Sequence, residues 1–335
     1  LSPIESPETD IGALAIGDRV CLIGGSPRRA SEVALFEPED GAFTTLRASV
    51  ETALPSDSVS IPRALSYPTS EDDTAHGYYY APKNADVDGP ASERPPLIVI
   101  GHGGPTSSTS TTLSPSIQYW TSRGFAVLDV NYRGSTGYGR AYREKLKGEW
   151  GVRDVADCVW GARYLVEQGL ADGERLAIRG GSAGGYTALA ALTFHDTFTA
   201  GASYYGISEL EALARDTHKF ESRYLDQLIG PYPDSREIYR ARSPIHFTDK
   251  LSCPVIFFQG LEDKVVPPNQ AEMMVEALVN KGLPVAYIAF EGEQHGFRAA
   301  DTIKRTLEAE LYFYGRVFGF APAGDVEPVE IKGLE

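Results

Sequence analysis

The stretch RGGSAGGY, residues 179–186, sets one serine among four glycines. Its central part matches the pattern G-x-S-x-G, in which a nucleophilic serine lies on a sharp turn between a strand and a helix. Glycine is needed beside such a serine because a Cβ would clash where the strand and the helix approach each other. The alternatives are a glycine-rich linker with an incidental serine and a dinucleotide-binding loop, which requires its own glycine spacing. The pattern predicts that Ser182 is a nucleophile for acyl transfer.

A serine hydroxyl needs a base to remove its proton, and the base needs an acid to orient it. Where the serine lies on such a turn, the acid and then the histidine follow it in the chain. His295, in EGEQHGF, comes directly after the apolar run 284–290 and is the expected base. Asp263, in GLEDKVVPP, follows the run 254–260 and is the expected acid, with Glu262 as the neighbour most easily mistaken for it.

The other histidines are expected to have structural roles. His195 falls near the end of the helix that follows the serine, and His246 lies in an irregular stretch. His102 lies in a glycine-containing loop and is expected to hold the shape of that loop. His218 belongs to a charged segment.

The tetrahedral intermediate of acyl transfer needs two hydrogen-bond donors aimed at its oxyanion. The first expected donor is the backbone N–H of Ala183, the residue after the nucleophile. The second should come from the loop after an early strand, and LIVIGHGGPTS offers such a loop. Its paired glycines allow backbone N–H groups to approach a substrate, and Gly104 is the expected donor.

Short apolar runs and helix-like segments alternate over most of the chain and must position these residues. The runs that predict buried strands cover residues 97–101, 125–132, 175–180, 200–206, 254–260 and 284–290. The segments with helical character cover residues 153–168, 186–194, 208–216, 269–282 and 300–320. Such alternation predicts an α/β fold with a mostly parallel central sheet covered on both faces.

The first part of the chain has a different character. Residues 1–55 predict short strands, with turns at Gly24-Gly25 and at PEDG, and residues 56–96 add a further strand pair. We expect a β-rich segment over residues 1–55, a catalytic domain over 56–322 and a C-terminal tail over 323–335.

The bulk composition excludes several classes of function. The chain has a net charge of −15, which repels phosphate backbones and anionic lipids, so nucleic-acid and membrane binding are not expected. No apolar run approaches the ~20 residues that span a bilayer, and LSPIESPETD lacks the regions of a signal peptide. Cys21, Cys158 and Cys253 form neither a disulfide framework nor a metal cluster in the sequence pattern. We expect a cytoplasmic protein that uses no metal and no cofactor.

Five motifs in this order and spacing, HGGPTS, NYRGSTGYG, GGSAGGY, GLEDKVVPP and EQHGF, resemble the prolyl oligopeptidase family of serine peptidases. The resemblance covers about residues 60–320 and is nearest to acylaminoacyl-peptidase and dipeptidyl-aminopeptidase-like members. It implies an α/β-hydrolase fold, a triad of Ser182, Asp263 and His295, and an oxyanion hole from Gly104 and Ala183.

Members of this family usually carry a β-propeller before the hydrolase domain. Only about 55 residues precede that domain here, whereas a propeller needs several blades of about 40–50 residues each. The β-rich segment resembles the last blade of such a propeller, so we expect the chain to be the C-terminal part of a longer protein. The alternative is a short N-terminal arm on a propeller-free hydrolase.

The resemblance also suggests residues that contact the substrate. The segment RDTHKFESRYLD, residues 215–226, resembles a region that lines the side-chain pocket, which makes Phe220 and Tyr224 candidate pocket walls. Its charged residues, which include Glu221, are expected to form a local network. Tyr132 and Arg133 follow a strand, so they either face the site or pack within their loop.

Three functions remain open at this point. The first is a serine exopeptidase that cleaves short peptides near the N-terminus, which the motif set favours. The second is a carboxylesterase or related small-molecule hydrolase with the same triad. The third is a catalytically silent binding module. The sequence does not choose among aminopeptidase, dipeptidyl-peptidase and acylaminoacyl-peptidase modes, and it leaves formation of a homo-oligomer open.

Overall fold

The computed structural model describes residues 6–51, 54–216 and 221–334. Its strands are β1 (Asp10–Ile16), β2 (Val20–Ser26), β3 (Arg29–Glu37), β4 (Ala42–Ala48), β5 (Arg63–Thr69), β6 (Asp73–Tyr80), β7 (Leu97–Gly101), β8 (Ala126–Asn131), β9 (Leu176–Gly181), β10 (Ala200–Tyr204), β11 (Val255–Gly260) and β12 (Val285–Phe290). Its α-helices are α1 (Pro115–Thr121), α2 (Gly139–Arg143), α3 (Arg153–Glu167), α4 (Ala183–Phe194), α5 (Leu210–Asp216), α6 (Tyr224–Leu228), α7 (Arg236–Ala241), α8 (Asn269–Lys281) and α9 (Ala300–Phe318). Short 3₁₀ helices are η1 (Ser70–Asp72), η2 (Glu144–Leu146) and η3 (Pro244–Lys250).

The central sheet has eight strands in the order β12-β11-β10-β9-β7-β8-β6-β5. The strands from β7 to β12 are parallel to one another, whereas β5 and β6 are antiparallel at one edge. This confirms the mostly parallel sheet predicted from the alternating pattern. The chain order reverses between β7 and β9, and the crevice beyond the ends of parallel strands at such a switch point is where ligands bind.

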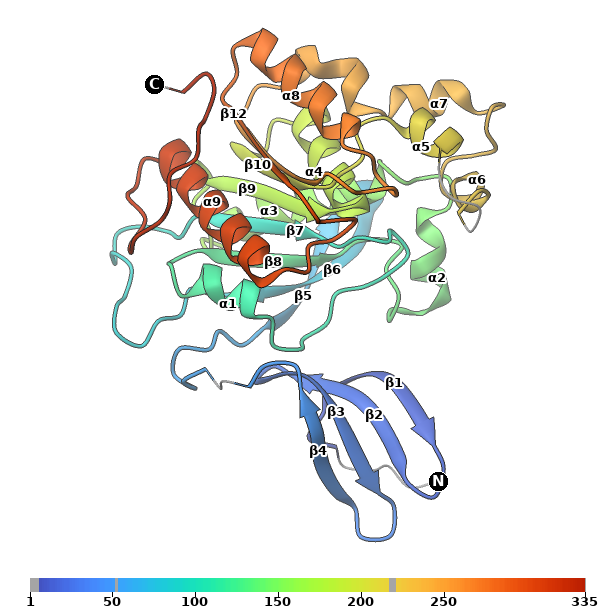
Figure 1. The fold of residues 1–335 in the computed structure, drawn as a ribbon, viewed down its shortest axis with the longest axis vertical. Coiled ribbons are helices and arrows are strands. Elements are labelled where there is room, and N and C mark those ends of the chain that lie inside the picture. The colour runs from blue at the N-terminus through green and yellow to red at the C-terminus, as the bar shows by residue number, and fades with distance from the viewer. Residues whose placement is uncertain (1–5, 52–53, 217–220, 335) are drawn as a thin grey trace.

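Helices cover both faces of this sheet (Figure 1). One apolar core joins the sheet to α3, α4 and α8 through buried side chains such as Val159, Leu189 and Met274. The other joins it to α1 and α9 through side chains such as Trp120 and Phe313. The inner parallel strands β7 to β11 are buried on both faces, which explains why they appear in the sequence as continuous apolar runs.

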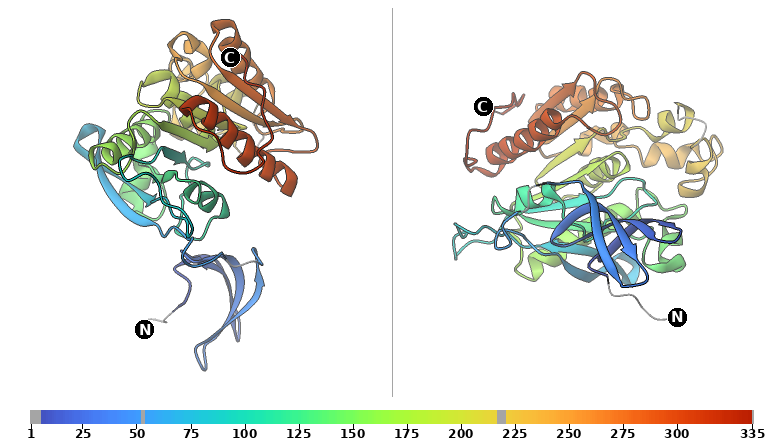
Figure 2. Two further views of the ribbon diagram at one scale, coloured as in Figure 1. Left: turned by 90° about the vertical axis from the view of Figure 1, so that its left-hand side faces the viewer. Right: turned by 60° about the horizontal axis from the view of Figure 1, so that its bottom comes forward.

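A separate four-stranded antiparallel sheet, in the order β1-β2-β3-β4, precedes the α/β body. Figures 1 and 2 show it extending from one end of that body. The backbone N–H of Leu113 donates to the carbonyl oxygen of Ser26 at 2.9 Å, and Thr112 Oγ1 lies 3.2 Å from an oxygen of Asp10. The loop between β7 and α1 therefore attaches the two sheets to each other.

The turn expected at Gly24-Gly25 is wrong, because β2 runs through both residues and turns after Ser26. The two glycines serve close packing instead. A Cβ on Gly24 would lie 2.7 Å from the side chain of Glu8, and one on Gly25 would lie 2.5 Å from Thr112. Nothing in the local sequence distinguishes this use of glycine from a turn.

The segment expected as a C-terminal tail contributes to the sheet edge. The backbone of Lys332 exchanges two hydrogen bonds of 2.9 Å with Val285 of β12. Ile331 is buried beside it. In the parts of the chain that the structure describes, no helix combines the length and the apolar character needed to cross a membrane.

Candidate active site

Ser182 occupies the turn between β9 and α4 with φ 56° and ψ −122°. Residues with a side chain rarely adopt a positive φ, and such a conformation persists only where the surroundings enforce it. Its backbone N–H donates to the carbonyl oxygen of Tyr204 at 3.0 Å, and its carbonyl oxygen accepts from the N–H of Tyr186 at 3.0 Å. The turn is thereby tied to β10 and to the first turn of α4.

Two glycines of the G-x-S-x-G pattern are explained by their neighbours. A Cβ on Gly180 would lie 2.3 Å from the carbonyl group of Gly184. A Cβ on Gly184 would lie 2.1 Å from the carbonyl oxygen of Gly101 in β7. No real side chain fits at either distance, so the close approach of strand and helix depends on both glycines.

The structure brings the three predicted triad residues together. His295 Nε2 lies 2.9 Å from Ser182 Oγ, and His295 Nδ1 lies 2.8 Å from Asp263 Oδ2. Asp263 is buried, and its Oδ1 accepts the backbone N–H groups of Val265 at 2.8 Å and Val266 at 2.9 Å. Glu262, the neighbouring carboxylate, is exposed. These distances suit proton transfer from a serine to an oriented imidazole.

The two expected oxyanion donors border the same cavity as Ser182. Gly104 lies in the loop after β7, and Ala183 is the first residue of α4. The N–H of a first helical residue has no partner within its own helix and is available to a ligand. Gly104 has φ 122°, a region open to glycine, and a Cβ on Gly103 would lie 3.2 Å from the carbonyl oxygen of Gly181. The loop therefore passes close to the nucleophile because it contains glycines.

His102 and Tyr132 hold this loop in place. His102 Nε2 lies 2.7 Å from Ser135 Oγ, and the ring stacks on Tyr132 with centroids 4.1 Å apart. The Tyr132 hydroxyl lies 3.0 Å from the carbonyl oxygens of both His102 and Pro105. Burial lowers the pKa of His102 to about 4, so the ring is neutral at pH 7. His102 shapes the loop, as its position in the sequence predicts.

We expect Tyr132→Phe to lower kcat about tenfold, because the oxyanion loop loses the hydroxyl that bridges two of its carbonyl groups. A buried carbonyl that loses its hydrogen-bond partner costs ~1–3 kcal/mol, and a tenfold loss in rate lies within that range. Tyr67→Phe is the matched control, since the Tyr67 hydroxyl also donates to a buried carbonyl, that of Asp157 at 3.0 Å, away from the loop. Steady-state kinetics and chemical unfolding on both variants check this. Equal kcat values for the two variants would contradict a role of Tyr132 in positioning the loop.

A cavity of about 310 Å³ opens beside Ser182. Gly104, Ala183 and His295 border it together with the serine. Its apolar lining consists of Trp150, Ile207, Leu213, Leu225, Val265 and Val266. Tyr224 also lines it, as predicted, and its hydroxyl lies 2.7 Å from Thr106 Oγ1. Phe220, the other predicted wall, lies outside the described residues.

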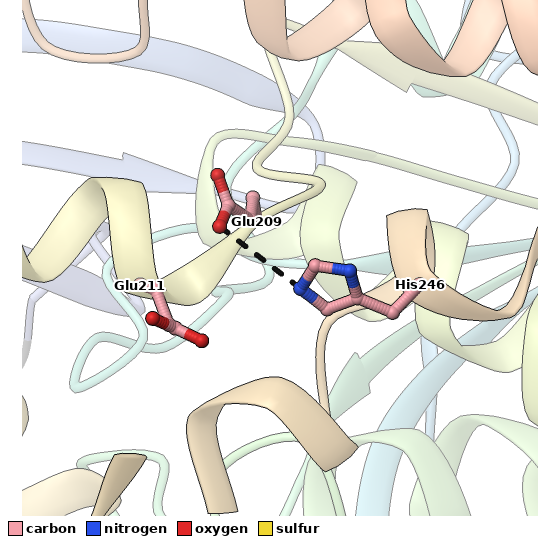
Figure 3. A group of neighbouring side chains, drawn as sticks. All are labelled: Glu209, Glu211 and His246. Carbon is pink, nitrogen blue, oxygen red and sulfur yellow. Dashed lines mark ion pairs between the residues drawn. The ribbon is translucent and has the colours of Figure 1, made fainter. Parts of the chain in front are cut away.

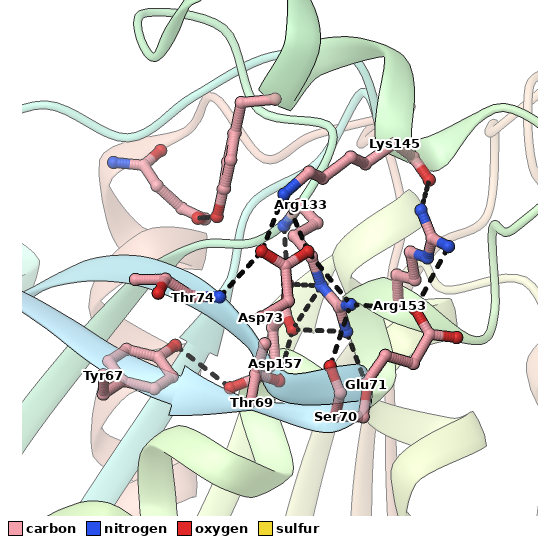
Figure 4. A network of polar contacts seen from close by, with 12 residues as sticks. Tyr67, Thr69, Ser70, Glu71, Asp73, Thr74, Arg133, Lys145, Arg153 and Asp157 are labelled. Atoms are coloured by element: carbon pink, nitrogen blue, oxygen red, sulfur yellow. Dashed lines mark hydrogen bonds and ion pairs between the residues drawn. The ribbon is translucent and has the colours of Figure 1, made fainter.

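Tyr132 and Arg133 were candidates for substrate contact, and the structure corrects this. Both side chains are fully buried, and the Arg133 guanidinium points to α3 instead of the cavity. Arg133 Nη2 lies 2.9 Å from Asp157 Oδ1 and donates to Ser70 Oγ at 2.7 Å. The backbone N–H of Arg133 also donates to Asp157 Oδ2 at 2.6 Å. Figure 4 shows how these contacts join η1, the end of β8 and α3.

We expect Asp157→Ala to lower the free energy of unfolding by about 3 kcal/mol, the lower end for a broken buried ion pair. The guanidinium of Arg133 would stay buried without its main carboxylate, while the more distant Glu71 and Asp73 remain nearby at 3.4 and 3.6 Å. Asp73→Ala is the control, because Asp73 is partly exposed and pairs mainly with Lys145. Urea unfolding of both variants checks this, and equal losses would contradict a dominant role of the buried pair.

Sequence analysis missed Tyr205, which lies beside the triad. Its ring packs edge-on against His295, with centroids 5.0 Å apart. Its φ of 40° is unusual for a residue with a side chain, and its N–H donates to the carbonyl oxygen of Phe258 at 2.8 Å. Its position directly after β10 was the available signal, since site residues gather at the ends of parallel strands.

Glu209, Glu211 and His246 form one group, among the described residues, that could offer ligand atoms to a metal ion (Figure 3). His246 Nε2 lies 4.0 Å from Glu209 Oε1. Glu211 Oε2 already accepts from Arg236 Nε at 2.9 Å, which balances its charge. Glu211 on α5 is thus paired with Arg236 on α7, while Glu209 lies just before α5 and His246 lies on η3, and we assign no metal to the group.

Comparison of the chain with known proteins identifies one matching protein family. The model of the prolyl oligopeptidase family matches residues 111–321. Dipeptidyl aminopeptidase BIII of Pseudoxanthomonas mexicana is 32% identical over 76% of this chain and 38% of its own length. The acylamino-acid-releasing enzyme of Arabidopsis thaliana is 32% identical over 60% of this chain and 27% of its own.

A solved puromycin-hydrolyzing peptidase of Mycobacterium tuberculosis superposes with a TM-score of 0.95 and 47% identity. The match covers 98% of this chain and 50% of that one, so the chain spans about half the length of this relative. These matches confirm the resemblance predicted from the five motifs and the α/β-hydrolase fold. The chain belongs to the prolyl oligopeptidase family.

Proposed function

We propose that this chain is the catalytic part of a serine exopeptidase that hydrolyses short peptides near their N-terminus. The observation that carries the proposal is the continuous hydrogen-bonded series from Ser182 through His295 to Asp263, with contacts of 2.9 and 2.8 Å. The peptidases among the chain's relatives support peptides as the substrate class.

Acylation begins when Ser182 Oγ attacks the carbonyl carbon of the scissile bond. His295 Nε2 takes the hydroxyl proton as the new C–O bond forms. Asp263 accepts from Nδ1–H, which holds the ring with Nε2 towards the serine and stabilises the imidazolium. The fixed carboxylate of Asp263 is suited to this because two backbone N–H groups bind its other oxygen.

The N–H groups of Gly104 and Ala183 stabilise the negative charge that develops on the carbonyl oxygen. The tetrahedral intermediate collapses when the C–N bond breaks and His295 gives its proton to the leaving amine. Water then attacks the acyl-enzyme with the same base, and Ser182 is released with the free acid. Apart from the attacking water, each step uses side chains and backbone groups of this chain.

The proposal extends to the domain organisation and the location of the protein. The four antiparallel strands of the N-terminal sheet, together with the chain's half-length match to its relatives, support residues 1–55 as the last blade of a propeller. On this view residues 56–322 form the hydrolase domain, and an N-terminal part of the same protein covers the site. Three free cysteines support a cytoplasmic location.

A small substrate panel tests the proposal. It contains free and N-acetylated aminoacyl arylamides, dipeptidyl arylamides and a short acyl ester, with Ser182→Ala as the blank. Arylamide cleavage that disappears in the blank supports a peptidase. Cleavage of the ester alone would overturn the peptidase assignment for this chain and favour the esterase function, because an ester has the better leaving group.

A further inference from the structure

A second cavity lies beside the nucleophile turn, over the other face of the sheet from the cavity described above. It has a volume of about 330 Å³, and side chains of the core beneath α1 and α9, such as Ile117, line it. Trp150 and the other apolar walls of the first cavity belong instead to the core that joins α3, α4 and α8. Gly181 borders the second cavity, and Ser182 borders the first. The nucleophile therefore lies between the first cavity and this second one, the α9-side cavity.

A peptide that is cleaved by acyl transfer extends in both directions from the scissile bond. The first cavity suits the acyl part, because the oxyanion donors Gly104 and Ala183 border it together with the nucleophile. The leaving part must then extend to the other side of Ser182. Gly181 precedes the nucleophile and places no side chain between it and the α9-side cavity. This cavity is therefore within reach of the leaving part.

Arg179 brings a guanidinium group to the wall of the α9-side cavity. The residue is 9% exposed, and its guanidinium carbon lies 4.8 Å from the ring centroid of Tyr204. Nη1 is buried and has no hydrogen-bond partner among the residues that the structure describes. A buried donor without a partner destabilises the folded protein. An acceptor that enters the cavity and binds this guanidinium therefore removes a cost that the fold itself leaves.

Glu310 on α9 holds the guanidinium in place without using all of its donors. Its Oε2 lies 3.3 Å from Arg179 Nη2, and it also accepts hydrogen bonds from the hydroxyl groups of Tyr204 and Tyr314. A guanidinium has five N–H donors in a planar fork whose geometry matches a carboxylate. The contact to one oxygen of Glu310 leaves donors for a second carboxylate. The chemistry of this wall therefore favours a ligand that brings one.

Asp129 is the acidic residue among the described lining of this cavity, and its charge opposes such a ligand only above neutral pH. It is buried, and its Oδ2 accepts from Thr109 Oγ1. Burial raises the pKa of Asp129 to about 7, although Thr109 and Arg179 act in the opposite direction. Tyr80 and Cys158 also interact with Asp129, and burial keeps both uncharged near neutral pH by raising their pKa values. A protonated Asp129 adds an O–H donor to the site.

We propose that Arg179 binds a carboxylate group of the leaving part of the substrate in the α9-side cavity, in the first place the C-terminal carboxylate of a short peptide. This inference rests on the proposed peptidase function and deepens it, because it gives a preference for substrates with few residues after the scissile bond. The cavity is near the lower end of the volume range for ligand sites, which suits one or two residues. An aspartate or glutamate side chain in the leaving part offers the same chemistry, and the substrates of the test distinguish the two sources.

The test uses peptides that share one acyl part and differ only after the scissile bond. The acyl part is the one that the chain cleaves fastest in the substrate panel described above. The leaving parts are alanylalanine, alanylalanine amide and glutamylalanine amide, which bring a terminal carboxylate, no carboxylate and a side-chain carboxylate. We expect kcat/KM to be about 10- to 100-fold higher for alanylalanine than for its amide, the range for a hydrogen bond to a charged group. Mass spectrometry of the products checks that the same bond is cleaved in each peptide.

Arg179→Gln should abolish this preference, whereas Arg179→Lys, which keeps the charge without the planar fork, should keep part of it. Arg175→Gln is the matched control, because Arg175 directly precedes β9 and pairs with Asp172 at 2.5 Å. It should keep the whole preference. A merely structural role of Arg179 would lower activity on the acid and the amide together and would leave their ratio unchanged.

The pair of Arg179 and Glu310 is buried, so Arg179→Gln alone leaves a carboxylate without its cation and is expected to be less stable. The double variant with Glu310→Gln removes both charges and takes the place of the single variant if that variant does not fold. It also lacks the guanidinium, so it should lose the preference for the acid in the same way.

The pH dependence supplies a second readout. Asp129 loses its proton near pH 7 and then repels a carboxylate, so the ratio of kcat/KM for the acid to that for the amide should fall between about pH 6 and about pH 8. Groups that act on both peptides alike cancel in this ratio. Asp129→Asn keeps an uncharged side chain of the same size and should remove the fall.

The outcomes separate this inference from the proposed function. A preference for glutamylalanine amide over alanylalanine amide that Arg179→Gln abolishes supports the side-chain carboxylate as the source. Cleavage without any preference for a carboxylate, or a preference that the Arg179 variants leave intact, overturns the inference while the peptidase function stands. Absence of Ser182-dependent cleavage of every peptide overturns the proposed function, and the role inferred for Arg179 falls with it.

Discussion

Ser182→Ala is expected to lower kcat by about 10⁶-fold on any arylamide that the unmodified chain cleaves. The side chain of Ser182 supplies the atom that becomes acylated, and no other hydroxyl lies 2.9 Å from His295 Nε2 among the described residues. Any remaining turnover would come from the oxyanion donors and from binding, which alone accelerate hydrolysis by about 10³–10⁴-fold over the reaction in water. Active-site titration followed by steady-state kinetics measures this loss.

The fold should tolerate the change, because alanine keeps the Cβ and the backbone bonds of the turn involve the main chain of Ser182. The free energy of unfolding should therefore change little, and urea unfolding serves as the control. Loss of activity together with loss of the fold would leave the nucleophile to be tested with Ser182→Cys, which keeps a nucleophilic atom. Retention of more than about 1% of kcat in folded Ser182→Ala would contradict the account, given a predicted loss of ~10⁶-fold.

Asp263→Asn is expected to lower kcat by about 10⁴-fold with little change in fold. Asparagine keeps an oxygen that can accept from the N–H groups of Val265 and Val266, so the loop after β11 stays in place. Its amide nitrogen donates and cannot accept from His295 Nδ1–H at the position that Oδ2 now occupies. The imidazole then favours the tautomer with a proton on Nε2, which cannot take the proton of Ser182.

Glu262→Gln is the matched control for this prediction. It removes the charge of the adjacent carboxylate, which is exposed. We expect its kcat to lie within about twofold of the unmodified chain, because exposed charges interact weakly with their neighbours. Comparable losses in the two variants would show that net charge near the site matters and that the orientation of His295 does not.

Much of the candidate site could be predicted because its residues lie in strongly patterned surroundings. The inner parallel strands β7 to β11 are buried on both faces and are therefore continuous apolar runs, and the edge strand β12 is also an apolar run; the end of each run locates the next loop. Ser182, Asp263, His295 and Gly104 all follow such runs directly, and their order in the chain assigns a role to each. In the structure, all four residues lie beyond the C-terminal ends of the parallel strands.

The directions of side chains after a strand could not be predicted in the same way. Arg133 also follows a buried strand, yet its guanidinium turns to Asp157 on α3, 24 residues further along the chain. Asp157 in turn binds Thr69 Oγ1 at 2.7 Å, from the antiparallel edge of the sheet. Partners from three separate segments determine this direction, and no local pattern records them.

Covalent labelling with a fluorophosphonate tests the central claim, that His295 and Asp263 activate Ser182 as a nucleophile. The measurement is the intact mass of the labelled chain followed by peptide mapping, on the folded chain, on Ser182→Ala and on the unfolded chain. We predict one adduct per molecule, on the peptide that contains Ser182, and none in the variant or after unfolding. A folded chain that forms no adduct, or whose adduct lies on another residue, would contradict the account.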